Sequence, residues 1–222
     1  MTTAWLSFSL RVARSAQDLH DACAVRAAAY GHHLPQLRAA LAQPDAVDRH
    51  PGTVVLLCRD KDSGRPIGTA RVQRCAPKSP VEIEHDVTLP DWLSERPRAE
   101  VSRLAIMPGA DAMLRPMLIK ASFLFCAANQ IRWMVIGARS EALVRIYRRL
   151  GFIDAFDHGA ALPLAHGGGL PHHILALDIV GTERSWYQGQ HGLYTTIFET
   201  FHPDVQLFDT PGTAQPAERI AA

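Results

Sequence analysis

The chain of 222 residues carries a formal net charge of +1 and is 47% hydrophobic and 20% charged, which is typical of a globular protein with one full core. It contains no apolar run near the roughly 20 residues of a membrane span, and its first residues lack the basic leader and apolar core of a signal peptide. The four cysteines are far apart with no Cys-x-x-Cys pair, a pattern typical of reduced thiols, so we expect a cytoplasmic protein without a membrane span.

Hydrophobic periodicity predicts an alternation of strands and helices. The expected elements, in chain order, are a strand over 5–13, helices over 15–29 and 34–42, strands over 53–59 and 66–75, a proline-rich loop over 76–98 of the kind that covers a site, a strand over 99–107, a helix over 111–130, a strand over 132–138, a helix over 140–149 and strands over 152–156 and 172–180. This order predicts an α/β fold with a mixed central sheet and helices on both faces.

The chain is expected to divide near its C-terminal end. Residues 1–182 contain all the expected strands and form the main domain. A helical annex over 183–210 follows, and the polar stretch over 211–222 is expected to be a disordered tail.

The strand over 99–107 is unusual because it contains Glu100 and Arg103 within an otherwise apolar run. Burying either charge without a partner costs several kcal/mol, so a strand interior normally excludes both. Either the two side chains form a structural ion pair, or they face a cleft in which charge is used. The surrounding residues favour the cleft.

The segment from Glu100 to Leu150 is strongly basic, with eight Lys and Arg residues against three acids. Such a field suits an anionic partner, for example a nucleotide cofactor, a phosphopantetheine or an acidic carrier protein; the alternative is a solvated helix face. The segment lacks the motifs of a nucleic-acid binder, so no nucleic acid is expected.

Two further signals are not interpreted as sites. The adjacent pairs His32-His33 and His172-His173 do not have the spacing of metal ligands, so no metal is expected. The run over 167–169 contains three glycines but no following Lys-Ser/Thr, and we interpret it as a hairpin connection rather than a phosphate-binding loop.

The stretch from Glu141 to Phe152 ends in Tyr-Arg-Arg-Leu-Gly-Phe and resembles the last helix and following strand of GNAT acyltransferases. With the order of elements, the resemblance covers about residues 5–180 and implies the GNAT fold. Acetyl-CoA-dependent members carry a glycine-rich Arg/Gln-x-x-Gly-x-Gly/Ala loop whose amides hold the CoA diphosphate. Here that loop has one glycine, Gly109, and Asp111 places a negative charge where the diphosphate would bind. A donor without that group, an acyl-phosphopantetheine on an acyl carrier protein, fits better.

This departure points to the GNAT branch of autoinducer (acyl-homoserine lactone) synthases and the related N-acyl amino acid synthases of the FeeM type. The chain lacks the tryptophan that autoinducer synthases usually carry shortly after the first-helix aromatic, which favours the N-acyl amino acid synthases. The residues that resemble the branch, in chain order, are Arg26, Tyr30, Asp45, Asp48, Arg71, Glu100 and Arg103.

The resemblance implies attack of an amine on an acyl thioester, for which Glu100 is the candidate general base and Tyr147 the candidate acid for the departing thiolate. Glu100 and Arg103 can line one cleft only if the strand bulges near Ser102, since residues three apart otherwise face opposite sides. A bulge would free a backbone amide between Leu104 and Ile106 for the oxyanion. The arginines at 26, 71 and 103 are expected to hold an acceptor carboxylate or brace the acids, and the aspartates at 45 and 48 to bind its ammonium or cap a loop. The candidate contacts to the carrier or its phosphopantetheine are Arg115, Lys120, Arg139, Arg145 and Arg148.

These features predict a bacterial cytoplasmic N-acyltransferase that moves a medium or long acyl chain from acyl carrier protein to an amino acid. No tightly bound cofactor is expected, and acyl-CoA is the alternative donor. Three other functions stay open: an autoinducer synthase that uses S-adenosylmethionine, an acetyl-CoA-dependent N-acetyltransferase, and a catalytically inactive GNAT-fold binding module.

Overall fold

The computed structural model describes residues 2–31, 34–75 and 80–208; the expected tail over 211–222 lies outside the described residues. The strands are β1 (Thr2–Thr3), β2 (Phe8–Val12), β3 (Thr53–Asp60), β4 (Pro66–Arg74), β5 (Arg98–Ile106), β6 (Trp133–Ala138), β7 (Ile153–Asp154), β8 (Ala161–Leu164), β9 (Leu170–Asp178), β10 (Thr200–Phe201) and β11 (Val205–Gln206). The α-helices are α1 (Ala16–Gly31), α2 (Arg38–Leu41), α3 (Asp91–Ser94), α4 (Leu114–Ala128), α5 (Glu141–Arg149) and α6 (Ile179–Gln188). Short helical turns are η1 (Pro35–Leu37), η2 (Glu82–His85), η3 (Asp157–Gly159), η4 (Ala165–Gly167) and the π-helical turn η5 (Thr195–Glu199).

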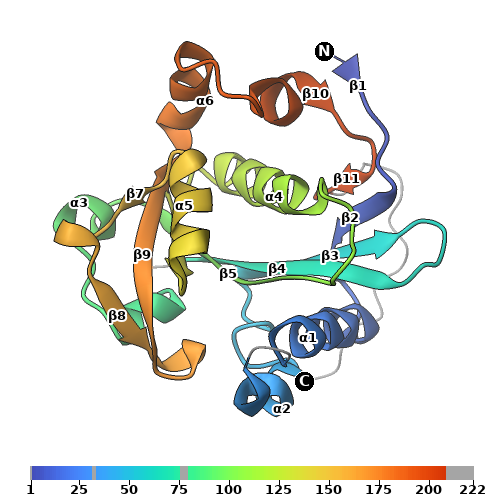
Figure 1. Cartoon of the computed structure of the whole chain (residues 1–222), viewed down its shortest axis with the longest axis horizontal. Helices are drawn as coiled ribbons and strands as arrows, with labels where there is room; N and C mark the ends of the chain where they lie inside the picture. The colour runs from blue at the N-terminus through green and yellow to red at the C-terminus, as the bar shows by residue number, and fades with distance from the viewer. Residues whose placement is uncertain (1, 32–33, 76–79, 209–222) are drawn as a thin grey trace.

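The strands form one large mixed sheet in the order β11-β2-β3-β4-β5-β6-β9-β7, with β8 also paired to β9. The β5–β6 and β11–β2 pairs are parallel, and the other pairs in this sheet are antiparallel. In Figure 1, α1 and α2 lie on one side of the β3–β5 region, and α4 lies on the other side. The predicted α/β fold with a mixed sheet and helices on both faces is confirmed.

Alternation along β3 explains why both faces are covered. Val55 and Leu57 pack against Ala22 of α1, whereas Leu56 and Cys58 belong to the main core under α4. A strand whose successive side chains are all apolar is stable only when both of its faces are buried. The strand expected over 53–59 is confirmed as β3.

The central strand β5 contains the expected bulge. Arg71 pairs with Ser102 and Thr69 pairs with Ala105, so two residues of β5, Arg103 and Leu104, stand opposite one residue of β4. Arg103 adopts a left-handed backbone conformation with φ of 54°, which is uncommon for a residue with a side chain. The bulge brings Glu100 and Arg103 to the same side of the sheet, as predicted.

Beyond the bulge, β5 separates from β6. The two parallel strands pair only from Arg98 to Val101 on β5, and the described ladder ends at Ile136 of β6. The second half of β5 is therefore paired on the β4 side alone, and its other edge opens towards the cleft described below.

The C-terminal segment is part of the same core, and the expected boundary between 182 and 183 falls inside α6. Asp178 ends β9 and caps α6 by accepting hydrogen bonds from the amides of Val180 and Gly181 (3.0 and 3.1 Å), so strand and helix are continuous. Trp186 of α6 and Ile197 of η5 are buried in the main core. The helical annex predicted over 183–210 thus begins earlier and includes short strands, because apolar side chains tie it to α4. No described helix has the length and apolar character to cross a membrane.

Candidate active site

A cleft of ≈ 320 Å³ lies beside the bulge of β5. Four segments that are far apart in the chain surround it: the α1–α2 region, β5, the end of β6 with the start of α5, and the turn between β8 and β9. Its apolar wall consists of Ala29, Leu34, Leu37, Leu41, Leu104, Ile106 and Leu143. Its polar groups are Tyr30, Glu100, Ser102, Arg103, Arg139, His166 and His172.

Glu100 lies at the buried side of this cleft with a side chain 1% exposed. Its Oε2 accepts a hydrogen bond from the amide of Ile83 (2.8 Å), while Oε1 has no hydrogen-bond partner in the described part of the chain. Burial raises the pKa of Glu100 to about 8, because the charged form loses its hydration. The carboxyl therefore holds a proton near neutral pH and exchanges it close to physiological conditions.

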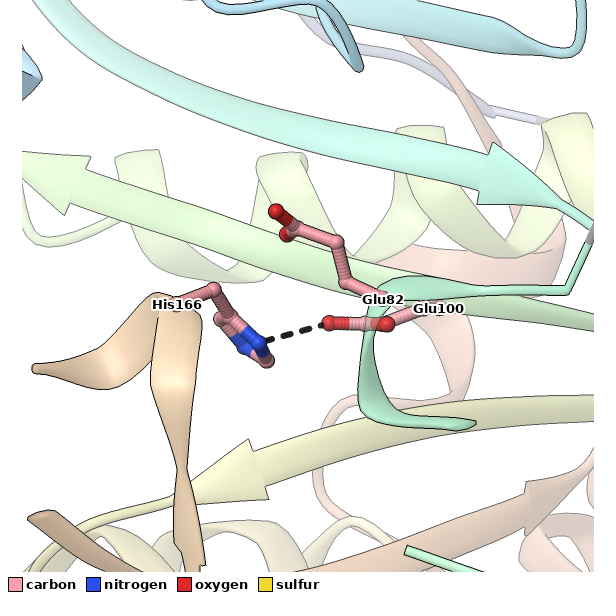
Figure 2. A group of neighbouring side chains, drawn as sticks. All are labelled: Glu82, Glu100 and His166. Atoms are coloured by element: carbon pink, nitrogen blue, oxygen red, sulfur yellow. Dashed lines mark ion pairs between the residues drawn. The ribbon is translucent and has the colours of Figure 1, made fainter. Parts of the chain in front are cut away.

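His166 faces the free oxygen of Glu100. Its Nε2 lies 3.5 Å from Oε1, as the dashed line in Figure 2 shows. The ring is placed by η4: Arg103 donates a hydrogen bond to the His166 carbonyl (2.8 Å), and Asp86 accepts one from the amide of Ala165 (2.8 Å). Burial lowers the pKa of His166 to about 4, so the imidazole is neutral at pH 7.

Arg71 is fully buried and does not reach the cleft. Its guanidinium donates to both oxygens of Asp45 (2.9 Å each), to Ser102 Oγ (3.1 Å) and to Glu82. These acids raise the pKa of Arg71 against the opposing effect of burial. Its position fits the alternative that it braces the acidic residues, and its predicted contact with substrate stays a prediction.

Arg26 and Asp48 form a second buried pair on the same network. Arg26 Nη1 lies 2.8 Å from Asp48 Oδ2, and both side chains are 2% exposed or less. Neither side chain lines the cleft, and the predicted substrate-binding roles of both residues stay predictions. An ion pair buried in this way is costly to break, since the remaining charge is left uncompensated.

Asp45 stands at the edge of the network. Its Oδ1 accepts from the amide of Asp48 (2.8 Å), and Asp48 Oδ2 accepts from the amide of Asp45 (3.1 Å), which is reciprocal loop capping. The Asp45 side chain is 38% exposed, but it binds Arg71 and does not line the cleft. Loop capping, the alternative that the sequence left open, therefore describes the aspartate pair.

Four other predicted residues do line the cleft. Ser102, Leu104 and Ile106 reach it from β5, and Tyr30 reaches it from the end of α1. The Tyr30 hydroxyl donates to the Leu104 carbonyl (2.9 Å), which ties α1 to the bulge. Their predicted roles in binding substrate stay predictions, and their place in the cleft wall is compatible with those roles.

Tyr147 lies outside the residues that line the cleft. It is 3% exposed on α5, its ring packs 5.4 Å from that of Phe152, and Arg115 lies beside its hydroxyl. Burial raises the pKa of Tyr147 to about 12. Both its position and its weak acidity fit a packing residue better than a proton donor.

The basic residues predicted to contact a carrier divide into two groups. Lys120 is buried and donates to the carbonyls of Thr196 (2.9 Å) and Thr200 (2.6 Å), which ties the C-terminal segment to α4; its predicted docking role stays a prediction. Arg115 is half-buried. The exposed members are Arg139, Arg145 and Arg148, of which Arg148 is paired with Asp154.

Asp111 occupies the N-terminal end of α4, the end at which a helix attracts anions. Its Oδ1 accepts from the amide of Met113 (2.8 Å), and its Oδ2 accepts from the Ser7 hydroxyl (2.6 Å). These hydrogen bonds lower the pKa of Asp111, which keeps it ionised. The carboxylate thus places a negative charge beside the first residues of α4.

Glu82, Glu100 and His166 each offer a ligand atom, all within 4.8 Å of one another, and could in geometric terms hold a metal ion. Glu82 is already bound to Arg71, however, and its Oε1 lies 3.9 Å from Arg103 Nη2. A dication would have to displace or tolerate two guanidinium groups, so the charges of this site do not fit a metal.

Sequence reasoning missed Glu82 and His166. Glu82 lies in the proline-rich segment that was expected to cover a site, and η2 in that segment also supplies the Ile83 amide to Glu100. His166 precedes the glycine run that was interpreted as a hairpin connection. The available signal was a histidine beside a glycine turn, which has no specific meaning until the fold brings it to Glu100.

The comparisons with known proteins agree with this architecture. No family model and no curated protein sequence matches the chain. Among solved structures it is similar to FeeM, an N-acyl amino acid synthase from uncultured soil microbes (14% identity, TM-score 0.61, 85% of this chain and 99% of that chain). It is also similar to BjaI, a CoA-dependent acyl-homoserine lactone synthase (17% identity, TM-score 0.57, 91% of this chain and 94% of that chain). A third similar structure is a putative acetyltransferase of the GNAT family from Desulfovibrio desulfuricans (16% identity, TM-score 0.54, 78% of this chain and 99% of that chain). At these identities the likeness establishes architecture, and the chain therefore has the GNAT acyltransferase fold.

Proposed function

We propose that this chain is a cytoplasmic N-acyltransferase that moves a medium or long acyl chain from a phosphopantetheine thioester of acyl carrier protein to the amine of an amino acid. One observation carries the proposal. A buried carboxyl with a free oxygen, Glu100, lies at the bulge of the central strand beside a cleft with a leucine-rich wall. FeeM, which is similar in fold, is an N-acyl amino acid synthase.

Glu100 is the proposed general base. The amine attacks the thioester carbonyl, a C–N bond forms, and the C–S bond breaks to release a thiolate. The ionised form of Glu100 accepts at Oε1 the proton that the nitrogen loses, and because its pKa is about 8 this form becomes abundant as the pH approaches 8. The amides between Leu104 and Ile106, on the edge of β5 that leaves β6, are proposed to stabilise the oxyanion.

The apolar wall is the proposed site of the acyl chain. Leu34, Leu37 and Leu41 follow one another along η1 and α2 and face the cleft together with Leu104 and Ile106. Burying each methylene of an acyl chain here contributes about 0.8 kcal/mol. The Met- and Phe-rich helix over 113–125 packs in the main core and is not part of the proposed acyl site.

Arg103 and Arg139 are the guanidinium groups that line the cleft, and we propose that they bind the carboxylate of the acceptor. Arg103 lies 3.9 Å from the carboxylates of Asp45 and Glu82, which is too far for direct hydrogen bonds. Its charge is therefore less fully engaged than that of Arg71.

The proposed donor is acyl carrier protein because Asp111 opposes a diphosphate at α4. Phosphopantetheine lacks the diphosphate, and acidic carriers are attracted by exposed arginines such as Arg139 and Arg145. BjaI is CoA-dependent, so the two donors are to be compared directly.

The test is mass spectrometry of lipid extracts from cells that overproduce the wild type or Glu100→Gln. We expect N-acyl amino acids with the wild type and their loss with the variant, at unchanged protein level and melting temperature. Acyl-homoserine lactones instead would identify an autoinducer synthase. The absence of both products would contradict the proposal, whether the protein then acetylates an amine with acetyl-CoA or shows no activity.

The donor is tested with purified protein and the acceptor identified in the extracts. The same acyl chain is offered on carrier protein and on CoA, and we expect kcat/KM to be higher with the carrier. Equal or better use of acyl-CoA would contradict this part of the proposal and leave acyl transfer to the amino acid unchanged.

A further inference from the structure

The proposed reaction leaves one proton transfer without a donor. An ammonium acceptor has three N–H bonds and the amide product has one, so the nitrogen loses two protons. One of them must reach the thiolate sulphur, while the other leaves to solvent. Glu100 can accept a proton from the nitrogen, but its Oε2 is bound to the Ile83 amide and its Oε1 faces His166. A second group is needed to protonate the sulphur.

Tyr147, the donor expected from the sequence, is poorly placed for this step. It is buried on α5 and does not line the cleft. A phenol whose pKa is about 12 also donates weakly to a thiolate, whose conjugate thiol has a pKa near 8.5.

His166 satisfies both geometric requirements. It lines the cleft, and its Nε2 lies 3.5 Å from the free oxygen of Glu100. Its other ring nitrogen, Nδ1, is buried without a hydrogen-bond partner in the described part of the chain. A buried polar atom without a partner costs about 1–3 kcal/mol and calls for an explanation. The relay proposed below requires that substrate binding bring the sulphur within reach of Nδ1, which is closed to solvent in the free protein.

An unpartnered ring nitrogen does not suffice by itself, as His173 demonstrates. His173 Nδ1 is also unpartnered, and its Nε2 lies 3.3 Å from Glu141. Glu141, however, is 66% exposed, and His173 does not line the cleft. What distinguishes His166 is the buried carboxyl at one nitrogen combined with a place in the cleft wall.

The charges around His166 favour a neutral ring. Desolvation and the nearby Arg103 and Arg71 disfavour the imidazolium, so the ring does not store a positive charge. A neutral imidazole can still transfer a proton when it donates from one nitrogen while it accepts at the other. The remaining charged or titratable groups that act on the ring are Glu82 and His172.

We propose that His166 is the catalytic acid for the leaving thiolate and works as a neutral relay. The proton that Glu100 has taken from the acceptor nitrogen passes from Oε1 to Nε2 as the Nδ1–H bond breaks and the S–H bond forms. The ring ends as the other tautomer and is reset by exchange with solvent. The inference rests on the proposed function and goes beyond it, because it assigns a second proton-transfer group from a turn between β8 and β9.

The test compares two acyl thioesters of the same chain length, an alkyl thioester of pantetheine and an aryl thioester whose thiolate leaves without a proton. His166→Gln should lower kcat with the alkyl thioester by about 10²-fold or more and with the aryl thioester only slightly. His166→Asn should behave alike, and melting temperatures establish that both variants fold.

Two matched controls accompany the test. His173→Gln removes a histidine with the same kind of carboxylate partner outside the cleft and should leave both rates unchanged. Tyr147→Phe should show no dependence on the leaving group. Equal losses with both thioesters for the His166 variants, or a leaving-group dependence for Tyr147→Phe, would overturn the relay while acyl transfer by the wild type stands. No transfer by the wild type from either thioester would overturn the proposed function as well.

A second measurement does not depend on the variants being active. ¹⁵N NMR of histidine-labelled wild type should show the His166 ring neutral at pH 6, with hydrogen on Nδ1. The opposite tautomer, or an imidazolium at that pH, would contradict the proposal.

Discussion

Glu100 couples the candidate site to the stability of the whole protein. In the folded chain its pKa is about 8, whereas the ordinary value is 4.5. Between these values the folded state holds a proton that the unfolded state has released, so raising the pH favours unfolding. The raised value arises mainly from burial, which is only partly offset by the Ile83 amide and the nearby arginines.

We therefore expect the free energy of unfolding of the wild type to fall, relative to that of Glu100→Gln, as the pH rises from 5 to 8. The slope of the difference is at most about 1.4 kcal/mol per pH unit, since one proton is involved. Urea unfolding at several pH values measures it. A constant difference between the two proteins over this range would show that Glu100 ionises normally.

The sequence identified several residues of the buried polar network, but it did not predict which partners they contact. Arg26, Asp48 and Arg71 were found by their order along the chain, but each is buried in an ion pair and none lines the cleft. A sequence gives residue types and spacing; it does not give which carboxylate meets which guanidinium. Arg71 donates a hydrogen bond to Glu82, and this partner could not be predicted because Glu82 lies in a segment without hydrophobic periodicity.

At the scale of the element, the bulge of β5 was predictable. Glu100 and Arg103 are three residues apart and would face opposite sides of a regular strand, so they can share a cleft only if the strand bulges between them. Its cause could not be predicted: Arg103 takes a left-handed φ of 54° and is held there by its bond to the His166 carbonyl. The strand β8 was missed, since the run over 161–164 is short and contains Pro163. The long strands and the helices α1, α4 and α5 were predicted correctly, because their apolar periodicity is strong.

A pair of substitutions isolates the strain at the bulge. Arg103→Gly and Arg103→Val both remove the guanidinium, but glycine adopts positive φ freely and a β-branched residue does not. Arg103→Val should be less stable than Arg103→Gly by about 1–3 kcal/mol in chemical unfolding. Equal stability of the two variants would mean that the left-handed conformation is not needed for the fold.

At the scale of the whole molecule, the C-terminal segment completes the core. In Figure 1 it passes over α4 from α6 to β10 and returns to the sheet at β11. Trp186, Ile197 and Leu207 are each less than 10% exposed in the main core, and Lys120 of α4 binds the carbonyls of Thr196 and Thr200. The boundary expected after residue 182 lies inside α6 and does not coincide with the end of a helix or strand.

A chain that ends at Thr182 should therefore lose cooperative unfolding and bind hydrophobic dyes, since it removes core side chains and interrupts α6. Trp186→Ala tests the same idea in the full chain and should lower the free energy of unfolding by about 3–5 kcal/mol. Circular dichroism melts and urea titrations measure both. A sigmoidal melt of the shortened chain near the wild-type temperature would restore the boundary after residue 182.

The leucine-rich wall of the cleft comes mainly from residues 34–41, whereas Glu100, Arg103 and His166 come from β5 and a distant turn. The residues proposed to bind the acyl chain thus lie mainly in a different segment from the residues proposed to transfer protons. Among descendants of this chain, drift within one short segment can alter the length of the preferred tail while the chemistry stays untouched. Under the proposed function, a change of product would then require no change in Glu100, Arg103 or His166.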